Sequence, residues 1–105
     1  MAAEDMRVEI TDEAIIVYRP PGRTESVKWR DLRAVLIETN DLGPLVDDVF
    51  WNLVGRKGGC VVPLGIEGEQ ALVACLQALE GFDNEMMITA MQSHDNQRFL
   101  CWERS

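Results

Sequence analysis

The sequence predicts an α+β fold, in which a predominantly antiparallel sheet, curved or partly closed into a barrel, is covered by one long and one short C-terminal helix. Short segments rich in β-branched and aromatic residues, separated by turn signals, fill the chain as far as Leu64. Helical spacing of apolar residues begins only after Gly68. The length of 105 residues fits a single domain, 1–105, that can bury a core without disulfide bonds.

The first four strands follow from the alternation of apolar and charged residues and from the breakers between them. Pro20-Pro21-Gly22 predicts a turn because proline cannot donate to a strand ladder. Trp29 is expected on the third strand, alternating with charged neighbours. The predicted strands are Met6–Ile10, Ala14–Arg19, Val27–Arg30 and Ala34–Thr39.

The segment Val46–Leu64 predicts a β-hairpin, with Arg56-Lys57 between glycines at its turn. Both faces of its first strand are apolar, so we expect both faces to be covered. One face is expected to carry Val49, Trp51 and Leu53, and the other Phe50, Asn52 and Val54.

Helical spacing after the hairpin predicts the long helix. Its buried face is expected to carry Leu72, Cys75, Leu76 and Leu79. Gly81 fits the left-handed position that commonly ends a helix.

Asp83 predicts the N-cap of the second, shorter helix, which runs to about Gln92. The apolar side of this helix is expected to carry Met87, Ile88 and Met91. Phe99–Trp102 predicts a short final strand or an extended tail packed on the core.

The composition of the chain indicates which classes of partner are expected. The chain has 18 acidic and 10 basic residues and a formal net charge of -8. Such a charge repels bare nucleic acids and anionic membranes, so neither is expected as a partner. The N-terminal residues predict no signal peptide, and no apolar run is long enough to span a bilayer. Three cysteines without a C-x-x-C pair predict free thiols and a cytoplasmic location.

The consecutive strands, the junction Trp29-Arg30-Asp31-Leu32 and the helix after them resemble bacterial pleckstrin-homology-like (PH-like) domains over Met6–Leu79. This resemblance implies a bent antiparallel sheet closed at one end by an amphipathic helix. The residues after Gly81 depart from a simple PH-like domain, whose chain ends with the helix.

A second resemblance concerns the C-terminal part of the chain, which is similar to a pattern in small uncharacterised bacterial proteins. That resemblance implies no activity and no functional residue. It rests on the string Gly81-Phe82-Asp83-Asn84-Glu85, followed by Ala90-Met91, Phe99, Cys101 and Trp102.

Candidate catalytic groups are few. Nucleophilic catalysis would pair His94, the only histidine, with Cys101 or Cys60. Because Cys60 begins an apolar strand and Cys75 lies on a helix face expected to be buried, we interpret the thiols as inert. One histidine and three scattered cysteines make a poor zinc ligand set. We predict no catalytic residue, no cofactor and no metal site.

Acidic residues cluster in the predicted loop Asn40–Asp48. Asp41, Asp47 and Asp48 follow Glu38, but their spacing does not match a calcium-binding loop. The three aspartates are candidate partner-binding residues for a protein with a cationic surface.

Glycines around Arg56-Lys57 suggest a phosphate cradle formed by backbone N–H groups. No helix begins there and no phosphate-loop pattern is present, so a hairpin turn explains the segment better.

Together these patterns favour a non-enzymatic binding or scaffold module that recognises a protein partner. The alternative is a small-ligand-binding protein or enzyme with a pocket between sheet and helix, near Trp51, Cys101 and Trp102. Core packing is expected for the tryptophans, Trp29 included. A concave cavity with convergent polar groups would favour the alternative.

Overall fold

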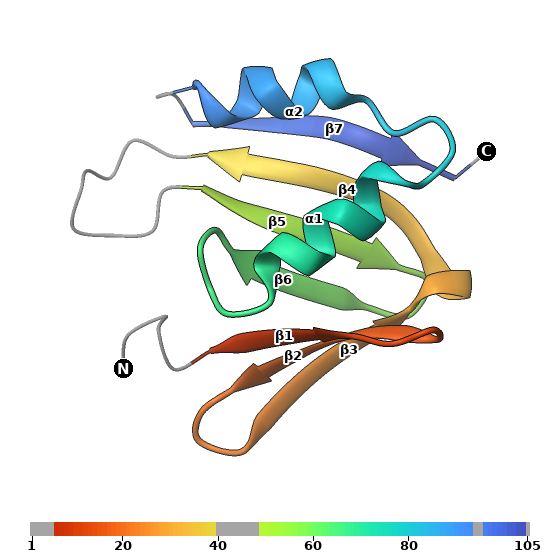
Figure 1. Cartoon of the computed structure of the whole chain (residues 1–105), viewed down its shortest axis with the longest axis vertical. Helices are drawn as coiled ribbons and strands as arrows, with labels where there is room; N and C mark the ends of the chain where they lie inside the picture. Colours follow the sequence, from red (N-terminus) through yellow and green to blue (C-terminus); the bar gives the residue numbers. More distant parts are fainter. Residues whose placement is uncertain (1–5, 40–48, 94–95, 105) are drawn as a thin grey trace.

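The computed structural model describes residues 6–39, 49–93 and 96–104. These residues form strands, two α-helices and one 3-10 turn (Figure 1). In chain order the elements are β1 Arg7–Ile10, β2 Ala14–Arg19, β3 Arg23–Lys28, η2 Trp29–Asp31, β4 Leu32–Thr39, β5 Val49–Gly55, β6 Gly59–Pro63, α1 Glu69–Gln77, α2 Asn84–Met91 and β7 Gln97–Glu103.

The strands form two antiparallel sheets, one in the order β1-β2-β3 and one in the order β6-β5-β4-β7. The predicted α+β class is therefore confirmed. The expected single sheet is divided at η2, and the strands do not close into a barrel. The last strand pairs with β4, so the chain after α2 belongs to the larger sheet and is not a loose tail.

Strand register places one face of each sheet in a shared core. Ile37 pairs with Trp51, and Leu53 pairs with Cys60, so these side chains share the inner face of the larger sheet. Ile15 and Val17 contribute from the smaller sheet. Each fully buried aliphatic side chain stabilises the fold by about 1.5–3 kcal/mol before entropy is counted.

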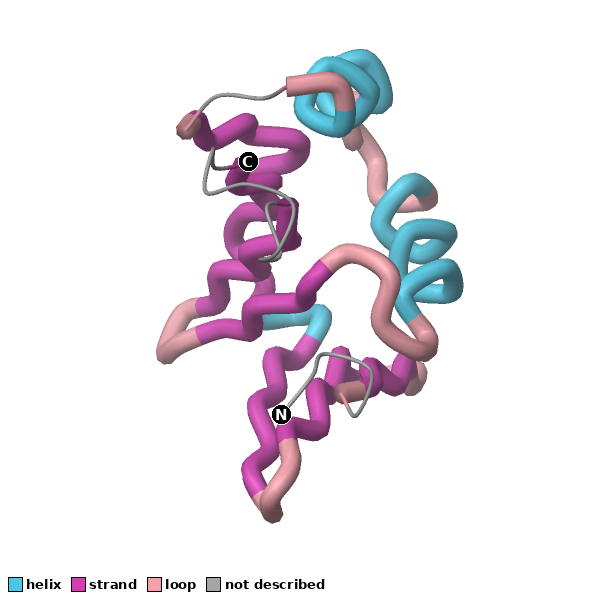
Figure 2. The backbone as a smooth tube through the Cα atoms, turned by 90° about the vertical axis from the view of Figure 1, so that its left-hand side faces the viewer, coloured by secondary structure: helices cyan, strands magenta, loops and turns pink. Residues whose placement is uncertain are grey.

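The two helices lie on one side of the larger sheet (Figure 2). Leu72 and Leu76 of α1 are fully buried in the common core, as the helical spacing predicts. α1 packs against β1, and α2 packs against β7 and β4. α1 therefore links the smaller sheet to the larger one.

Trp29 does not lie on a strand, contrary to the expectation from alternation. The third strand ends at Lys28, and Trp29 begins η2. The Leu32 N–H donates to the Trp29 carbonyl, which closes a tight turn. The chain must turn here because the next strand belongs to the other sheet.

The helices also differ from the prediction in length. α1 has 9 residues and α2 has 8, so there is no long and short pair. α1 ends at Gln77, and Leu79 and Gly81 lie in the turn that follows. Gly81 has the predicted positive φ, +88°.

The N-cap of α2 is confirmed, but of its predicted apolar side only Met87 packs against the core. The Asp83 carboxylate accepts a hydrogen bond from the Met86 N–H at 2.9 Å. Ala90 is fully buried, and Met86 and Met87 are half-buried, whereas Ile88 is 53% exposed and Met91 is also exposed. The small Ala90 side chain allows the helix to approach the sheet closely, so the buried face is rotated from the one that residue size suggested.

The outer face of the larger sheet is not covered by a helix (Figure 2). The expectation that both faces of β5 are covered is wrong at Val54, and Leu100 on β7 is likewise exposed. Phe50 and Asn52 are half-buried on this face. Cross-strand neighbours in an antiparallel sheet shield one another without a further layer.

The two sheets meet where the free edge of β6 faces the smaller sheet. Arg19 donates to the Val61 carbonyl, and Glu25 accepts from the Val61 N–H at 3.4 Å. Arg19 Nε lies 3.0 Å from Glu25 Oε2. The side chains of Arg19 and Glu25 thus bond the backbone groups of the β6 edge that a neighbouring strand would otherwise bond.

Candidate functional site

An open groove lies between the β1–β2 turn, η2 and the end of α1. It has a volume of about 430 Å³. Its lining is mainly apolar and comprises Ile10, Trp29, Cys75, Ala78 and Leu79. Thr11 and Asp12 add polar groups at one side. We call this surface the Trp29 groove.

The β1–β2 turn holds the Trp29 ring in place. The indole N–H donates to the Thr11 carbonyl at 3.0 Å, and the Trp29 backbone N–H donates to the Glu13 carbonyl at 2.9 Å. Thr11 in turn accepts from the Ala14 N–H through its hydroxyl at 2.9 Å. The ring is therefore fixed before any ligand arrives, which lowers the entropy cost of binding.

The opposite wall of the groove comes from the end of α1. Ala78 is exposed and has only a methyl side chain, so it leaves space beside the half-buried Leu79. The half-buried Cys75 contributes the thiol that lines this wall. The wall offers apolar contact area and few polar groups, which suits an apolar side chain.

Sequence reasoning did not find this groove. It placed Trp29 on a strand and in the core, whereas the structure leaves the ring half-buried at a corner. The signal that could have found it was the breaker Asp31 directly after Trp29-Arg30, which marks a turn that exposes one side of the ring.

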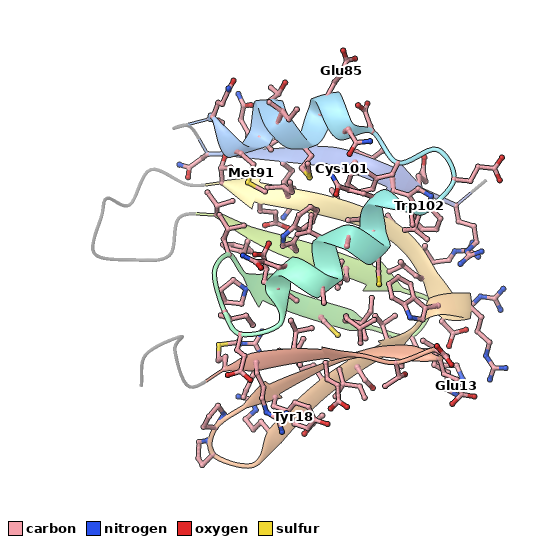
Figure 3. All side chains as sticks on the ribbon, viewed as in Figure 1. Glu13, Tyr18, Glu85, Met91, Cys101 and Trp102 are labelled. Atoms are coloured by element: carbon pink, nitrogen blue, oxygen red, sulfur yellow. The ribbon has the colours of Figure 1, made fainter. Side chains whose placement is uncertain are left out.

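The three residues of the predicted pocket lie in the core and do not line the Trp29 groove. Trp51 is fully buried, and its indole N–H donates to Glu69 Oε2 at 3.1 Å. The Trp102 indole N–H donates to the Glu80 carbonyl at 2.9 Å. Figure 3 shows Cys101 and Trp102 on β7. Strand β4 separates them from Trp51, and a pocket at these residues stays a prediction.

Burial disfavours the thiolate at two cysteines. It raises the pKa of Cys60 to about 11, with the nearby Glu25 carboxylate adding to the effect. It also raises the pKa of Cys101 to about 11, and the Asp83 carboxylate acts in the same direction. Because the thiolate is the nucleophile, neither thiol is activated at neutral pH. His94, the histidine that nucleophilic catalysis would require, lies outside the described residues.

The acidic loop with Asp41, Asp47 and Asp48 also lies outside the described residues, so its role stays a prediction. Its described neighbour Glu38 accepts from the Asn52 amide at 2.6 Å and lies 3.7 Å from Arg98 Nε. Within the described ranges, no three His, Cys, Asp or Glu side chains are grouped as metal ligands. No described helix has the length and hydropathy to cross a membrane.

Comparison with known proteins gives no relative for this chain. No family model matches it, and neither the curated proteins nor the solved structures contain a significant match.

Proposed function

We propose that this chain is a non-enzymatic, cytoplasmic protein-binding module, and that the Trp29 groove receives an apolar side chain of its partner. The observation that carries the proposal is the groove itself, an open apolar surface beside an aromatic ring that the fold already holds. Tryptophan is enriched among the residues that dominate protein–protein binding energies.

The mainly apolar lining of the groove supports a large apolar side chain as the ligand group. Burying a leucine- or phenylalanine-sized side chain contributes about 1.5–3 kcal/mol. That contribution alone gives weak binding, so the partner must make further contacts around the groove.

The PH-like layout belongs to the same proposal. It is supported by the order of antiparallel strands followed by α1, although the strands form two sheets and not the single bent sheet that the resemblance implies. The elements α2 and β7 are additions to that arrangement.

A small-ligand site is the second candidate, because the groove lies between the smaller sheet and α1, although Trp51, Cys101 and Trp102 do not line it. Only Thr11 and Asp12 contribute polar side chains to its lining. Small-molecule sites usually enclose the ligand more fully and orient it with several polar groups. The open surface therefore favours a side chain of a larger partner.

The test is a selection of peptides from a random display library against the full-length chain. We expect the enriched sequences to share one large apolar residue. Ala78→Arg should abolish their binding by filling the groove, because residue 78 lines it. The matched control is Ala74→Arg, which makes the same substitution at an exposed residue of α1 that does not line the groove.

Both substitutions add the same charge and keep a good helix former near the end of α1. Equal binding by the two variants would remove the groove from the proposal. Enrichment of sequences without a shared apolar residue would contradict the proposal as well. Binding of small aromatic compounds but of no peptide would favour the small-ligand alternative.

A further inference from the structure

We propose that the partner segment carries carboxylates beside its apolar side chain, and that a line of exposed cations next to the Trp29 groove binds them. This inference rests on the proposed function, because it identifies the chemistry of the ligand that the same surface would take.

Two further hollows continue from the groove along η2. The first, of about 270 Å³, is lined by Asp12, Glu13, Lys28, Trp29 and Arg30, and it shares Trp29 and Asp12 with the groove. We call it the rim hollow. Glu13 marks its place at one corner of the molecule in Figure 3.

The second hollow, of about 210 Å³, lies between the end of β3 and the β5–β6 turn. Its charged and hydroxyl side chains are those of Ser26, Lys28, Asp31, Arg56 and Lys57. We call it the basic hollow. It shares Lys28 with the rim hollow, so the three surfaces are adjacent.

The cations of these hollows are not engaged within the fold. Lys28, Arg30, Arg56 and Lys57 are all exposed. None of them forms an ion pair with another residue in the part of the chain that the structure describes. They stand together on a chain whose formal net charge is -8.

The backbone presents two of these cations from a fixed turn. The Gly55 N–H donates to the Gly58 carbonyl at 2.6 Å, and the Arg56 N–H donates to the Asp31 carbonyl at 3.0 Å. The β5–β6 turn is therefore tied to η2. Arg56 and Lys57 are held beside Lys28, and neither side chain forms an ion pair with another residue in the described ranges.

The arrangement of charge favours several carboxylates over one compact dianion such as phosphate. The cations are distributed over two hollows instead of converging on one point. Asp31 lines the basic hollow and would repel a dianion placed at its centre. Because Asp12 and Glu13 also line the rim hollow, the carboxylates of an extended segment are expected mainly at Lys28, Arg56 and Lys57, while its apolar side chain occupies the groove.

Three fluorescein-labelled peptides test this inference by fluorescence anisotropy with the full chain. The first has one leucine flanked on both sides by glutamates. The second replaces every glutamate with glutamine, and the third replaces the leucine with serine. We expect the first peptide to bind about three- to tenfold more tightly than the second, since each exposed charge pair contributes modestly. Added salt should reduce this difference.

The cations are tested with Arg56→Gln/Lys57→Gln, which should remove most of the glutamate advantage. The matched control is Arg23→Glu, which lowers the net charge by the same amount at an exposed site on β3 that lines neither hollow. The control should retain the advantage, because the inference depends on position and not on net charge.

The outcomes separate the two proposals. Equal binding of the glutamate and glutamine peptides, or an equal loss in both variants, would overturn the inference and leave the groove in place. Equal binding of the leucine and serine peptides, or an unchanged affinity in Ala78→Arg, would contradict the proposed function instead. Failure of all three peptides to bind would contradict both. Inorganic phosphate could also displace the glutamate peptide at concentrations far below those at which chloride does. That result would favour a single dianion as the ligand and would overturn the inference of an extended acidic segment.

Discussion

Two regions of the molecule use charged residues in opposite ways. At the seam, where Arg19 and Glu25 meet Val61, the charged groups bond to each other and to the free edge of β6. At the η2 corner, Lys28 and Arg56 are exposed beside an apolar groove, and neither forms an ion pair with a described residue. The charged side chains of the seam stabilise the fold, whereas those of the corner remain available to bind a ligand.

The seam, which is the contact between the smaller sheet and the rest of the molecule, also includes the far edge of that sheet. There the Val8 N–H donates to the Glu67 carbonyl at 2.9 Å, which ties β1 to the loop before α1. Substitutions at the seam should therefore change stability, and substitutions at the corner should change binding.

The largest effect is expected for Gly68→Ala at the seam. Gly68 has φ +90°, and a Cβ there would collide with the Val8 carbonyl oxygen. The left-handed backbone costs about 1–2 kcal/mol for a residue with a Cβ, and the collision adds about 1–3 kcal/mol of overpacking. Urea unfolding of the variant should show the combined loss.

Gly81→Ala is the control for backbone strain alone. Gly81 has φ +88°, and a Cβ there meets no atom within 4 Å. This variant should lose only the backbone cost of about 1–2 kcal/mol. Equal losses in the two glycine variants would show that β1 and the loop before α1 are not in close contact.

A smaller effect is expected for Arg19→Ala. This change removes the side-chain donor to the Val61 carbonyl and the cation beside the Glu25 carboxylate, which still accepts from the Val61 N–H. An unsatisfied, partly buried polar group costs about 1–3 kcal/mol. The corner control, Arg56→Ala/Lys57→Ala, should stay within about 0.5 kcal/mol of the wild type. A corner double variant as unstable as Arg19→Ala would mean that the corner cations also stabilise the fold.

The third prediction compares a cysteine at each region. Cys60 lies near Arg19 and Glu25 with a side chain that is 1% exposed, whereas Cys75 lines the groove and is half-buried. Iodoacetamide at about pH 8 should modify Cys75 well before Cys60, because access and thiolate fraction both limit the buried thiol. Peptide mapping by mass spectrometry gives the order, and all three thiols should react once the chain is unfolded in urea.

The smallest effect concerns alkaline pH. Burial raises the pKa of Cys60 from 9.0 to about 11. As pH rises, the Cys60 thiol therefore loses its proton at a lower pH in the unfolded chain than in the folded protein. The stabilising effect of keeping the Cys60 thiol buried and neutral is complete below about pH 9 and is lost as pH rises toward about 11. Urea melts at about pH 8 and about pH 10 should show a smaller decrease in Cys60→Ala than in the wild type. An equal decrease in both would assign the loss to other groups.

Much of the fold was predictable because local signals agreed with tertiary packing. Alternation located β1, β2, β5 and β6, and Asp83 located the start of α2. The division into two sheets was not predictable, because it depends on the tight turn at Trp29 and on long-range pairing of β7 with β4. The buried face of α2 was only partly predicted, because its one fully buried residue is the small Ala90 and not a large apolar side chain.

The candidate site was less predictable than the fold. The Trp29 groove joins residues from the β1–β2 turn, η2 and α1, which are distant in sequence and carry no shared motif. The basic hollow was partly foreseeable, since Arg56-Lys57 stood out among glycines. Only the structure brings that turn beside Lys28 and Asp31.

The central claim, that the η2 corner is the binding surface, is tested most directly by the three tryptophan indole N–H signals in a nitrogen-15 NMR titration. The probe is the peptide with one leucine flanked by glutamates. The account predicts that the Trp29 signal moves with the backbone signals of Ala78 and Lys28, while the signals of the core residues Trp51 and Trp102 stay in place. Movement confined to Val54 and Leu100 on the outer face of the larger sheet, with Trp29 unchanged, would contradict it.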